Sequence, residues 1–140
     1  MQRTLAIIKP DAVQRHLAGK ILARLEAEGF VVLGLKMVSL NKPDAERFYA
    51  VHRERPFFHD LTSYMASGPA VPVLLQRDNA IQALRDLMGP TNPAQAASGT
   101  LRQAFGLDVE KNAIHGSDSP ASAAEEIAFF FNHLEWHERS

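Results

Sequence analysis

Thr4-Leu5-Ala6-Ile7-Ile8-Lys9 is the stretch of sequence on which the predicted fold depends. Its continuous apolar run from Leu5 to Ile8 favours a strand that is buried on both faces of a sheet. Pro10 follows at once and is expected to end this strand. The chain therefore starts with a strand that other elements have to cover.

The rest of the chain alternates between helical and extended patterns. Apolar residues at helical spacing predict a helix over 17–28, which Gly29 would end as a C-cap glycine. Further strands are predicted at 30–40, 70–76 and 112–115, and further helices from Lys42 onward and at 57–67, 80–88 and 121–131. Two strand–helix–strand units in tandem predict an α/β (α+β) fold. We expect a ferredoxin-like split βαβ, with a four-stranded antiparallel sheet and helices packed on it.

Length and composition indicate a single domain over residues 1–140, because 140 residues is near the most common domain size. Without cysteine, the chain can form no disulfide, thiolate zinc site or iron–sulfur cluster. Its apolar runs are too short for a membrane span or a signal peptide, so we expect no membrane association and a cytoplasmic location.

The charge balance disfavours a protein that coats nucleic acid. Fifteen basic and 16 acidic residues give a net charge of −1, whereas nucleic-acid-binding domains are usually basic. A small phosphorylated ligand remains compatible, since a few arginines and lysines are enough to bind a phosphate. We therefore expect no specific nucleic-acid partner.

Two segments depart from regular patterns. Residues 89–100 are rich in Gly, Pro and small side chains and predict a long loop, which in a compact domain is usually functional or disordered. Pro72 lies inside the strand at 70–76, where its missing N–H is expected to disturb the local pairing.

Common nucleotide-binding and hydrolase motifs are missing from the sequence. It contains no G-x-x-x-x-G-K-[ST], G-x-G-x-x-G or G-x-S-x-G pattern. His133 and His137 are four residues apart, as in a helical metal site, but they lack the H-E-x-x-H glutamate and lie near the chain end. We therefore predict no metal site that is held directly by protein ligands.

The segment Asn112-Ala113-Ile114-His115-Gly116-Ser117-Asp118-Ser119 carries the clearest chemical signal. It places an imidazole at a strand end, beside hydroxyls, a carboxylate and a helix N-terminus that favours anions. Neutral imidazole is available near neutral pH and can attack phosphorus to form a covalent intermediate. On its own, however, a lone histidine is more often a structural residue.

This segment resembles the active-site signature of the nucleoside diphosphate kinase family, and the resemblance extends along almost the whole chain. The matching segments are Thr4 to Val13, Tyr49 to Phe58, Met65-Ala66-Ser67-Gly68-Pro69, Thr91-Asn92-Pro93 and Gly99-Thr100-Leu101-Arg102. The resemblance implies a Mg²⁺-dependent ping-pong transfer. The γ-phosphate of a nucleoside triphosphate, mainly ATP, would pass to His115 and then to a nucleoside diphosphate.

The resemblance also implies a role for each site residue. His115, Lys9, Tyr49, Asn112, Ser117 and Glu126 would be catalytic, with Glu126 orienting His115 and Ser117 assisting. The implied contacts to nucleotide come from Arg85, Thr91 and Arg102 on the outer phosphates, His52 on the inner one, Lys9 and Asn112 on the ribose, and Phe57, Leu61 and Val109 on the base. Mg²⁺ would arrive on the phosphates, with Asp118 helping through water. Because stacking on Phe57 reads no base edge, purines and pyrimidines should both be accepted.

Without the resemblance, several of these residues have ordinary structural readings. Phe57 and Leu61 would be core, Tyr49 a packing residue, and Arg85 and Glu126 solvated charges. Two other functions compete with the kinase, namely a nucleotide sensor of the same fold without turnover and an RNA-binding sheet. The family resemblance further implies a homo-oligomer built from dimers, either a tetramer or a hexamer.

Overall fold

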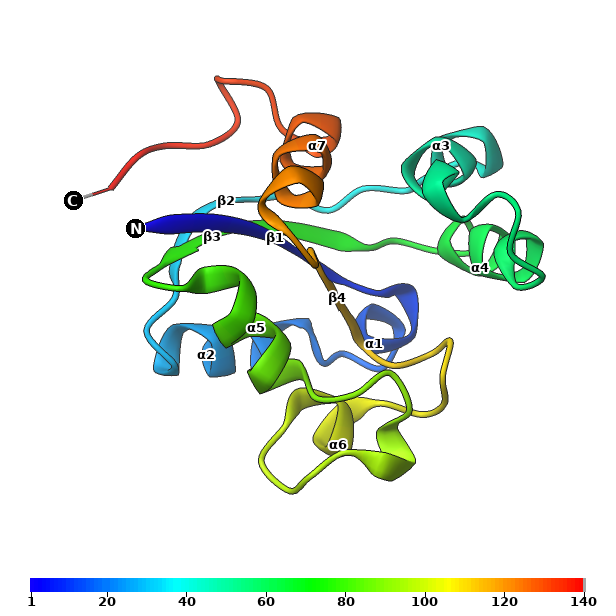
Figure 1. Ribbon diagram of the computed structural model, residues 1–140, viewed down its shortest axis with the longest axis horizontal. Helices are drawn as coiled ribbons and strands as arrows, with labels where there is room; N and C mark the ends of the chain where they lie inside the picture. The colour runs from blue at the N-terminus through cyan, green and yellow to red at the C-terminus, as the bar shows by residue number, and fades with distance from the viewer. Residues whose placement is uncertain (140) are drawn as a thin grey trace.

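The chain folds around a four-stranded antiparallel sheet with the strand order β2-β3-β1-β4 (Figure 1). The computed structural model describes residues 1–139, and Ser140 lies outside them. The strands are β1 (Gln2–Ile8), β2 (Val31–Leu35), β3 (Val71–Arg77) and β4 (Ile114–Gly116). The helices are α1 (Pro10–Gln14), α2 (Ala18–Ala27), α3 (Lys42–Phe48), η1 (Ala50–His52), α4 (Phe58–Met65), α5 (Ala80–Met88), η2 (Pro93–Gln95), α6 (Leu101–Phe105) and α7 (Pro120–Phe130). This topology confirms the predicted ferredoxin-like fold.

β1 lies between β3 and β4, and its side chains alternate between two cores. Ala6 and Ile8 join the core that also contains residues of α2 and α5, whereas Leu5 and Ile7 join the core that contains residues of α3, α4 and α7. Figure 1 shows α7 on one side of the sheet and α2 and α5 on the other. All four side chains are fully buried, which confirms the prediction of a strand covered on both faces.

The second strand is shorter than the pattern over 30–40 predicted. Regular pairing with β3 covers Val31–Leu35 and already contains a bulge between Val32 and Gly34. Farther along, Val38 meets Ala70 only in an isolated bridge. Apolar composition predicted an extended segment correctly, but the bulge inside β2 has no signal in hydrophobicity.

Pro72 disturbs the sheet on one side only. The β1–β3 ladder continues through the Ile7–Pro72 pair to Ile8–Val71, so the expected disturbance is absent there. On the other side, the β2–β3 ladder ends at Leu35–Val73, next to Pro72. The Pro72 carbonyl still accepts a hydrogen bond from the N–H of Lys36 at 3.3 Å. Because proline has no N–H to return, the β2 ladder stops here.

The segment 89–100, predicted as a long loop, is irregular except for the short helix η2, and it leads into α6. Asn92 accepts a hydrogen bond from the N–H of Ala94 and caps η2, and Thr100 accepts one from Gln103 and caps α6. α1 and α6 are each five residues long and were not predicted. Elements of that length are too short to show a helical hydrophobic period.

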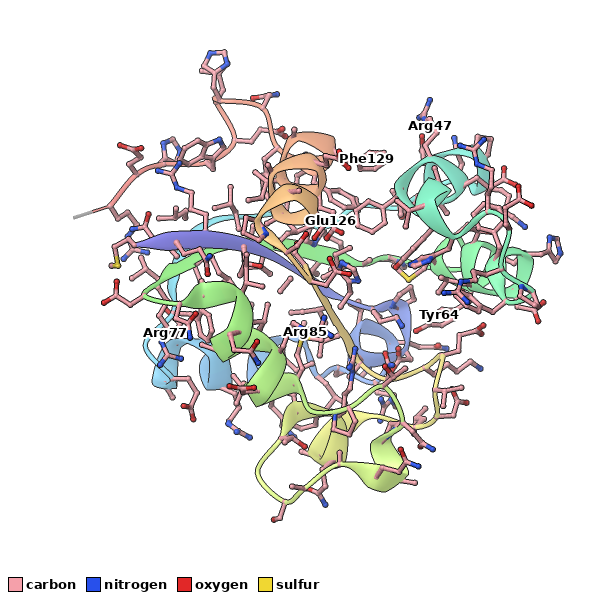
Figure 2. The ribbon with its side chains drawn as sticks, in the orientation of Figure 1. Arg47, Tyr64, Arg77, Arg85, Glu126 and Phe129 are labelled. Carbon is pink, nitrogen blue, oxygen red and sulfur yellow. The ribbon has the colours of Figure 1, made fainter. Side chains whose placement is uncertain are left out.

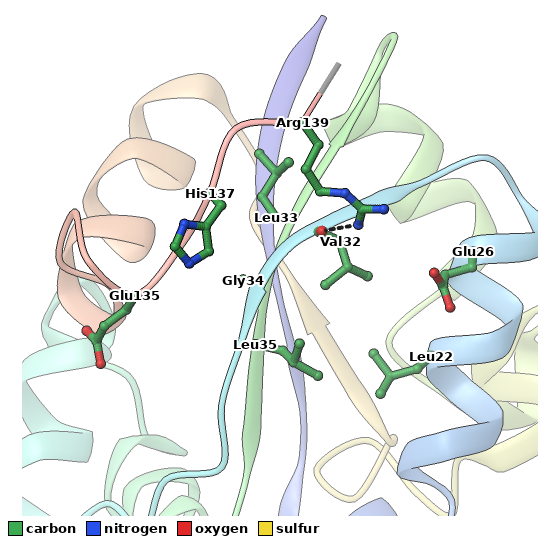
Figure 3. A pocket seen from close by; sticks show the side chains of 9 residues that line it. All are labelled: Leu22, Glu26, Val32, Leu33, Gly34, Leu35, Glu135, His137 and Arg139. Carbon is green, nitrogen blue, oxygen red and sulfur yellow. Dashed lines mark hydrogen bonds between the residues drawn. The ribbon is translucent and has the colours of Figure 1, made fainter.

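The C-terminal tail returns along the free edge of β2, where Figure 3 shows a shallow cavity. The N–H of His137 donates to the carbonyl of Leu33 at 2.9 Å, and Arg139 donates to the carbonyl of Val32 at 2.8 Å. A Cβ added to Gly34 would lie 2.8 Å from the Cβ of Trp136. The backbone of His137 thus holds the tail against β2. Within residues 1–139, no helix is long and apolar enough to span a bilayer.

Gly116 sets the distance between β4 and α5. A Cβ at this position would lie 2.7 Å from the sulfur of Met88 and 3.0 Å from a methyl group of Leu84. We therefore expect Gly116→Ala to lower the free energy of unfolding by about 1–3 kcal/mol, since overpacking a core forces its neighbours apart. Urea unfolding of both proteins measures this loss. An unchanged midpoint in Gly116→Ala would show that α5 can move freely, and Gly19→Ala, which meets open space, is the matched control.

Candidate active site

β4 carries His115 into the centre of the site. His115 pairs with Ile7 of β1, and its side chain is 22% exposed. Just before the strand, Ala113 has a φ of +77° and the N–H of Ile114 donates to the carbonyl of Asn112 at 3.0 Å. This is a classic γ-turn in shape, a rare and strained conformation. It redirects the chain so that His115 faces α7 and α3.

One carboxylate oxygen holds the His115 ring. Oε1 of Glu126 lies 2.7 Å from Nε2 of His115 and accepts the hydroxyl of Ser117 at 2.8 Å. Figure 2 shows Glu126 on α7 beside β4. A carboxylate at Nε2 favours the tautomer that carries its proton there. Nδ1 is then the ring nitrogen with the free lone pair.

Two aromatic rings form a wall beside the imidazole. Phe48 and Tyr49 approach the His115 ring edge to face, with centroid distances of 5.6 and 6.3 Å. Phe48 also packs against Phe129 and Phe130 of α7, which ties α3 to α7. Burial, with Glu126 adding to it, raises the pKa of Tyr49 well above its usual value, so its hydroxyl stays neutral. The wall limits how far the ring can tilt.

Lys9 joins the nucleophile region to the ribose-binding region predicted around Asn112. Its ammonium donates to Oδ1 of Asn112 at 2.9 Å and to the carbonyl of Glu110 at 2.7 Å. The amide of Asn112 in turn donates to the carbonyls of Thr91 and Val109 at 3.0 and 3.2 Å. Burial lowers the pKa of Lys9 to about 8. The structure thus brings together three segments that lie far apart in the sequence, namely Lys9, Thr91 and residues 109–112.

Arg102 is a half-buried cation that faces a second cation. Its guanidinium donates to the carbonyls of Gly89 at 3.0 Å and Ile114 at 2.8 Å, and its buried Nε has no hydrogen-bond partner within residues 1–139. Burial, followed by repulsion from Arg85, lowers the pKa of Arg102 to about 10. Two neighbouring guanidinium groups favour the binding of a phosphate between them. Each group can donate a pair of N–H hydrogen bonds to the phosphate oxygens.

Two of the three side chains predicted to bind the base are exposed to solvent. Phe57 is 46% exposed, and its ring lies 5.6 Å from that of His52, which is 6.4 Å from Tyr49. Val109 is 58% exposed, whereas Leu61 packs against the core. An exposed aromatic ring and an exposed aliphatic side chain are suited to holding a planar base, because burying them on a ligand removes apolar area from water.

Asp118 is an acidic residue that feels the charge of Arg85. Its carboxylate accepts the hydroxyl of Ser122 at 2.8 Å, which lowers its pKa, and the positive charge of Arg85 lowers it further. Within residues 1–139, no three His, Asp or Glu side chains gather into a metal site. A single ionised carboxylate fits a metal ion that arrives with a phosphorylated ligand.

The structure adds three residues that the sequence did not single out. Phe48 touches the His115 ring, and Asp11 and Tyr64 form a bonded pair behind Lys9. Phe48 directly precedes Tyr49, yet on α3 its apolar character predicts only core. No sequence pattern pairs Asp11 with Tyr64, because they belong to different helices.

Comparison with known proteins identifies the family. A family model described as nucleoside diphosphate kinase matches residues 2–136. The chain belongs to the nucleoside diphosphate kinase family. The nucleoside diphosphate kinase of Geobacter sulfurreducens is 56% identical over 135 residues, which cover 96% of this chain and 98% of that protein. That of Nitratidesulfovibrio vulgaris is 54% identical over 135 residues, with 96% and 97% covered.

Solved structures of the family agree with the fold. The nucleoside diphosphate kinase of Aquifex aeolicus superposes with a TM-score of 0.95 at 48% identity, over 96% of this chain and 98% of that one. That of Halobacterium salinarum, in complex with CDP, gives a TM-score of 0.96 at 38% identity, over 99% and 93%. The chain is thus a phosphotransferase of the nucleoside diphosphate kinase family, and the predicted activity is confirmed.

Glu126 provides a test of how this kinase orients its histidine. We expect Glu126→Gln to lower kcat about ten- to a hundredfold, because a neutral amide orients and stabilises the imidazole less well than a carboxylate. Steady-state kinetics with ATP and a nucleoside diphosphate measure the change. Glu125→Gln removes the same charge from an exposed neighbour on α7 and serves as the control. Equal rates in Glu126→Gln and the unaltered kinase would contradict the orienting role.

Proposed function

We propose that the reaction proceeds through a phosphohistidine at Nδ1 of His115. The Nδ1 lone pair attacks the γ-phosphorus of a nucleoside triphosphate, mainly ATP, and a P–N bond forms as the bond to the bridging oxygen breaks. The electron pair leaves with the nucleoside diphosphate. A terminal oxygen of a second nucleoside diphosphate then attacks the same phosphorus and releases the imidazole. The transferring group is strongly anionic, so the protein contributes mainly position and charge.

The observation that carries this proposal is the contact between Glu126 and Nε2 of His115. At 2.7 Å the carboxylate is within hydrogen-bond distance of the proton at Nε2 and opposes the positive charge that the ring gains when Nδ1 bonds to phosphorus. Ser117 donates to the same oxygen and keeps the carboxylate in place. The strained turn at Ala113 sets the direction in which β4 brings the ring into the site.

We assign the nucleotide contacts as the family resemblance implies, and the charge and exposure of the residues agree with these roles. The guanidinium groups of Arg85 and Arg102, with the Thr91 hydroxyl, hold the outer phosphates, and His52 lies near the inner one. Lys9 and Asn112 bind the ribose hydroxyls, and Lys9 and Tyr49 are close to the transferred phosphoryl group. The base stacks on Phe57, between Leu61 and Val109. Stacking without readout of base edges supports broad base specificity. The Halobacterium salinarum relative was solved in complex with CDP, which supports binding of a nucleoside diphosphate by this chain.

The site is suited to Mg²⁺ that is carried by the nucleotide. Asp118 offers one ionised carboxylate, whose Oδ1 is already bonded to Ser122, and it lies close enough to the arginines to act through water. When bound, Mg²⁺ neutralises phosphate charge and so favours transfer. The hydroxyl of Ser122 keeps the Asp118 carboxylate ionised and fixed in orientation.

Transfer of a radioactive label tests the proposal. The protein is incubated with γ-labelled ATP and Mg²⁺, isolated, and then mixed with unlabelled GDP. The expected product is an acid-labile, alkali-stable label on the protein, which GDP removes as GTP. A protein that binds nucleotide but never acquires the label would contradict the covalent route and favour a nucleotide sensor.

The depressed pKa of Lys9 predicts the alkaline limit of activity. Below a pH of about 8 the ammonium of the free enzyme is charged, and above it the charge is lost. Because a cation here attracts the phosphates, kcat/KM should fall as the pH rises through about 8. In Lys9→Arg the guanidinium stays charged, so this fall should disappear, whatever the absolute rate. Rates measured from pH 6 to 10 test this, and an unaltered alkaline limb in Lys9→Arg would show that another group causes it.

We further propose that this single domain forms a homo-oligomer built from dimers. Two exposed apolar side chains support this assignment, Leu35 at the end of β2 and Met37 just after it. Exposed apolar side chains are the kind of surface that a second copy can cover. Light scattering coupled to gel filtration distinguishes a monomer, which would contradict the assignment, from a dimer, tetramer or hexamer.

A further inference from the structure

Lys9 is a buried cation whose direct partners are neutral. It is 6% exposed, and both of its hydrogen bonds go to uncharged oxygens. These are the backbone carbonyl oxygen of Glu110 and the side-chain amide oxygen of Asn112. Removing an ammonium from water strongly disfavours its charged form, so some nearby negative charge has to compensate. The opposite charge with the largest effect on Lys9 is the carboxylate of Asp11, two residues farther along the chain.

The Asp11 carboxylate is itself buried and bonded through both oxygens. Its side chain is 3% exposed. Oδ1 accepts the hydroxyl of Tyr64, and Oδ2 accepts a guanidinium N–H of Arg15 at 3.1 Å. Arg15 also donates to the backbone carbonyls of Asp11, at 3.2 Å, and of Phe105, and so links α1 to the end of α6. These bonds leave Asp11 little freedom to turn toward Lys9.

Tyr64 connects α4 to this arrangement from the other side. Its oxygen accepts the N–H of Asp11 at 2.8 Å, while its ring lies 5.6 Å from the ammonium of Lys9. Figure 2 shows Tyr64 below α4, toward α1. Burial, together with the bond to Asp11, raises the pKa of Tyr64 well above its usual value, so the hydroxyl remains a donor. An aromatic face near an ammonium adds a further favourable interaction.

We propose that Asp11, held by Tyr64 and Arg15, is a positioning residue that keeps Lys9 charged without capturing it in an ion pair. The carboxylate supplies negative charge from a fixed position. Because its oxygens are already bonded, Lys9 stays directed at Asn112 and at the incoming nucleotide. Tyr64 thereby becomes a determinant of nucleotide binding although it lies behind the site. This inference rests on the role proposed above for Lys9 in binding the nucleotide.

Other charges around Lys9 act on it more weakly than Asp11 or oppose it. Arg102 of α6 repels the ammonium, and Glu110 and Asp108, both on the loop between α6 and β4, attract it. Asp108 is exposed and caps its own loop by accepting the N–H groups of Glu110 and Lys111. Water screens an exposed carboxylate, so Asp108 cannot replace Asp11.

Two variants with opposite expected effects test the proposal. Asp11→Asn removes the charge but keeps an oxygen for Tyr64, so the pKa of Lys9 should fall, by roughly one unit. Tyr64→Phe keeps the ring but frees Oδ1 of Asp11 to bind Lys9 directly. The pKa of Lys9 should then rise. The KM for nucleotide should also rise, about tenfold, as expected when one bond to a charged group is lost. Asp60→Asn removes the same charge from the exposed face of α4 and should change neither value.

NMR of the full-length protein labelled at the lysine ε-carbons measures the Lys9 titration without nucleotide, with Lys9→Arg assigning the signal. The alkaline limb of kcat/KM should move in the same direction as this titration in both variants. A Lys9 titration that is unchanged in Tyr64→Phe and Asp11→Asn would overturn the inference and leave Asp11 a purely structural residue. Should Asp11→Asn fail to fold, the titration and KM of Tyr64→Phe decide alone. If the titration moves as expected while no phosphoenzyme forms, the proposed function fails and the charge coupling stands.

Discussion

His115→Ala is expected to acquire no label from γ-labelled ATP and to lose at least about 10⁴-fold in kcat. Removing a covalent nucleophile costs factors of roughly this size or more, because no other group completes the first half of the reaction. The ring occupies a pocket between Glu126, Phe48 and Tyr49, and alanine leaves all three in place. Nucleotide binding should therefore survive, since the phosphates and base contact other residues. Isothermal titration with a nucleoside diphosphate measures this retained binding.

The control for this variant is another histidine that the site does not use. His133 is exposed on the tail after α7, so His133→Ala should be labelled to the same extent as the unaltered protein. Acid-labile label on His115→Ala would place the nucleophile elsewhere and remove the basis of the proposed mechanism. Loss of both label and nucleotide binding would indicate that the ring also supports the shape of the site.

Arg102→Ala is expected to lose both catalysis and stability. The guanidinium bonds to the carbonyls of Gly89 and Ile114, and so ties the loop after α5 to the start of β4. Losing two hydrogen bonds from a charged donor should lower the free energy of unfolding by about 3 kcal/mol. Because the strained turn at Ala113 precedes Ile114, the position of His115 should relax as well. With the phosphate contact also gone, we expect kcat/KM to fall at least about a hundredfold.

A comparison with Arg85→Ala separates the contribution of Arg102 to phosphate binding from its contribution to stability. It is exposed on α5, across from Arg102, so Arg85→Ala should reduce kcat/KM while the midpoint of urea unfolding stays unchanged. Measuring both quantities in both variants distinguishes phosphate binding from structural support. If Arg102→Ala were as stable as the unaltered protein, its two backbone contacts would contribute nothing to holding β4.

Local patterns were sufficient for much of the fold. β1 was predictable because a run of apolar residues has a direct physical cause, burial on both faces. α7 begins where Ser119 and Pro120 predict it, and Ser119 caps it through the N–H of Ser122. By contrast, the bulge in β2 and the short helices α1 and α6 depend on contacts with other segments, which no window of sequence contains.

The residues of the candidate site also fall into those with a local sequence signal and those without one. The 112–119 segment places an imidazole beside a turn and a helix N-terminus, and all of these are neighbours in the chain. Lys9, Tyr49 and Glu126 have no such local signal, and only the family resemblance singled them out. Phe48 and Tyr64 were missed because an aromatic residue on an amphipathic helix is normally core, and its partner lies on another element.

By itself, the sequence therefore determined the order of the strands and the longer helices, the double burial of β1 and the chemistry available at His115. These follow from forces that act between neighbours in the chain, such as hydrophobic periodicity, helix capping and the conformational limits of proline. Only the tertiary structure decided which nitrogen of His115 is free, which carboxylate sets the charge of Lys9 and which carbonyls hold Arg102. Those outcomes depend on hydrogen bonds and burial that join separate elements, such as Glu126 with His115, Tyr64 with Asp11 and Arg102 with Ile114, and that fix protonation and orientation.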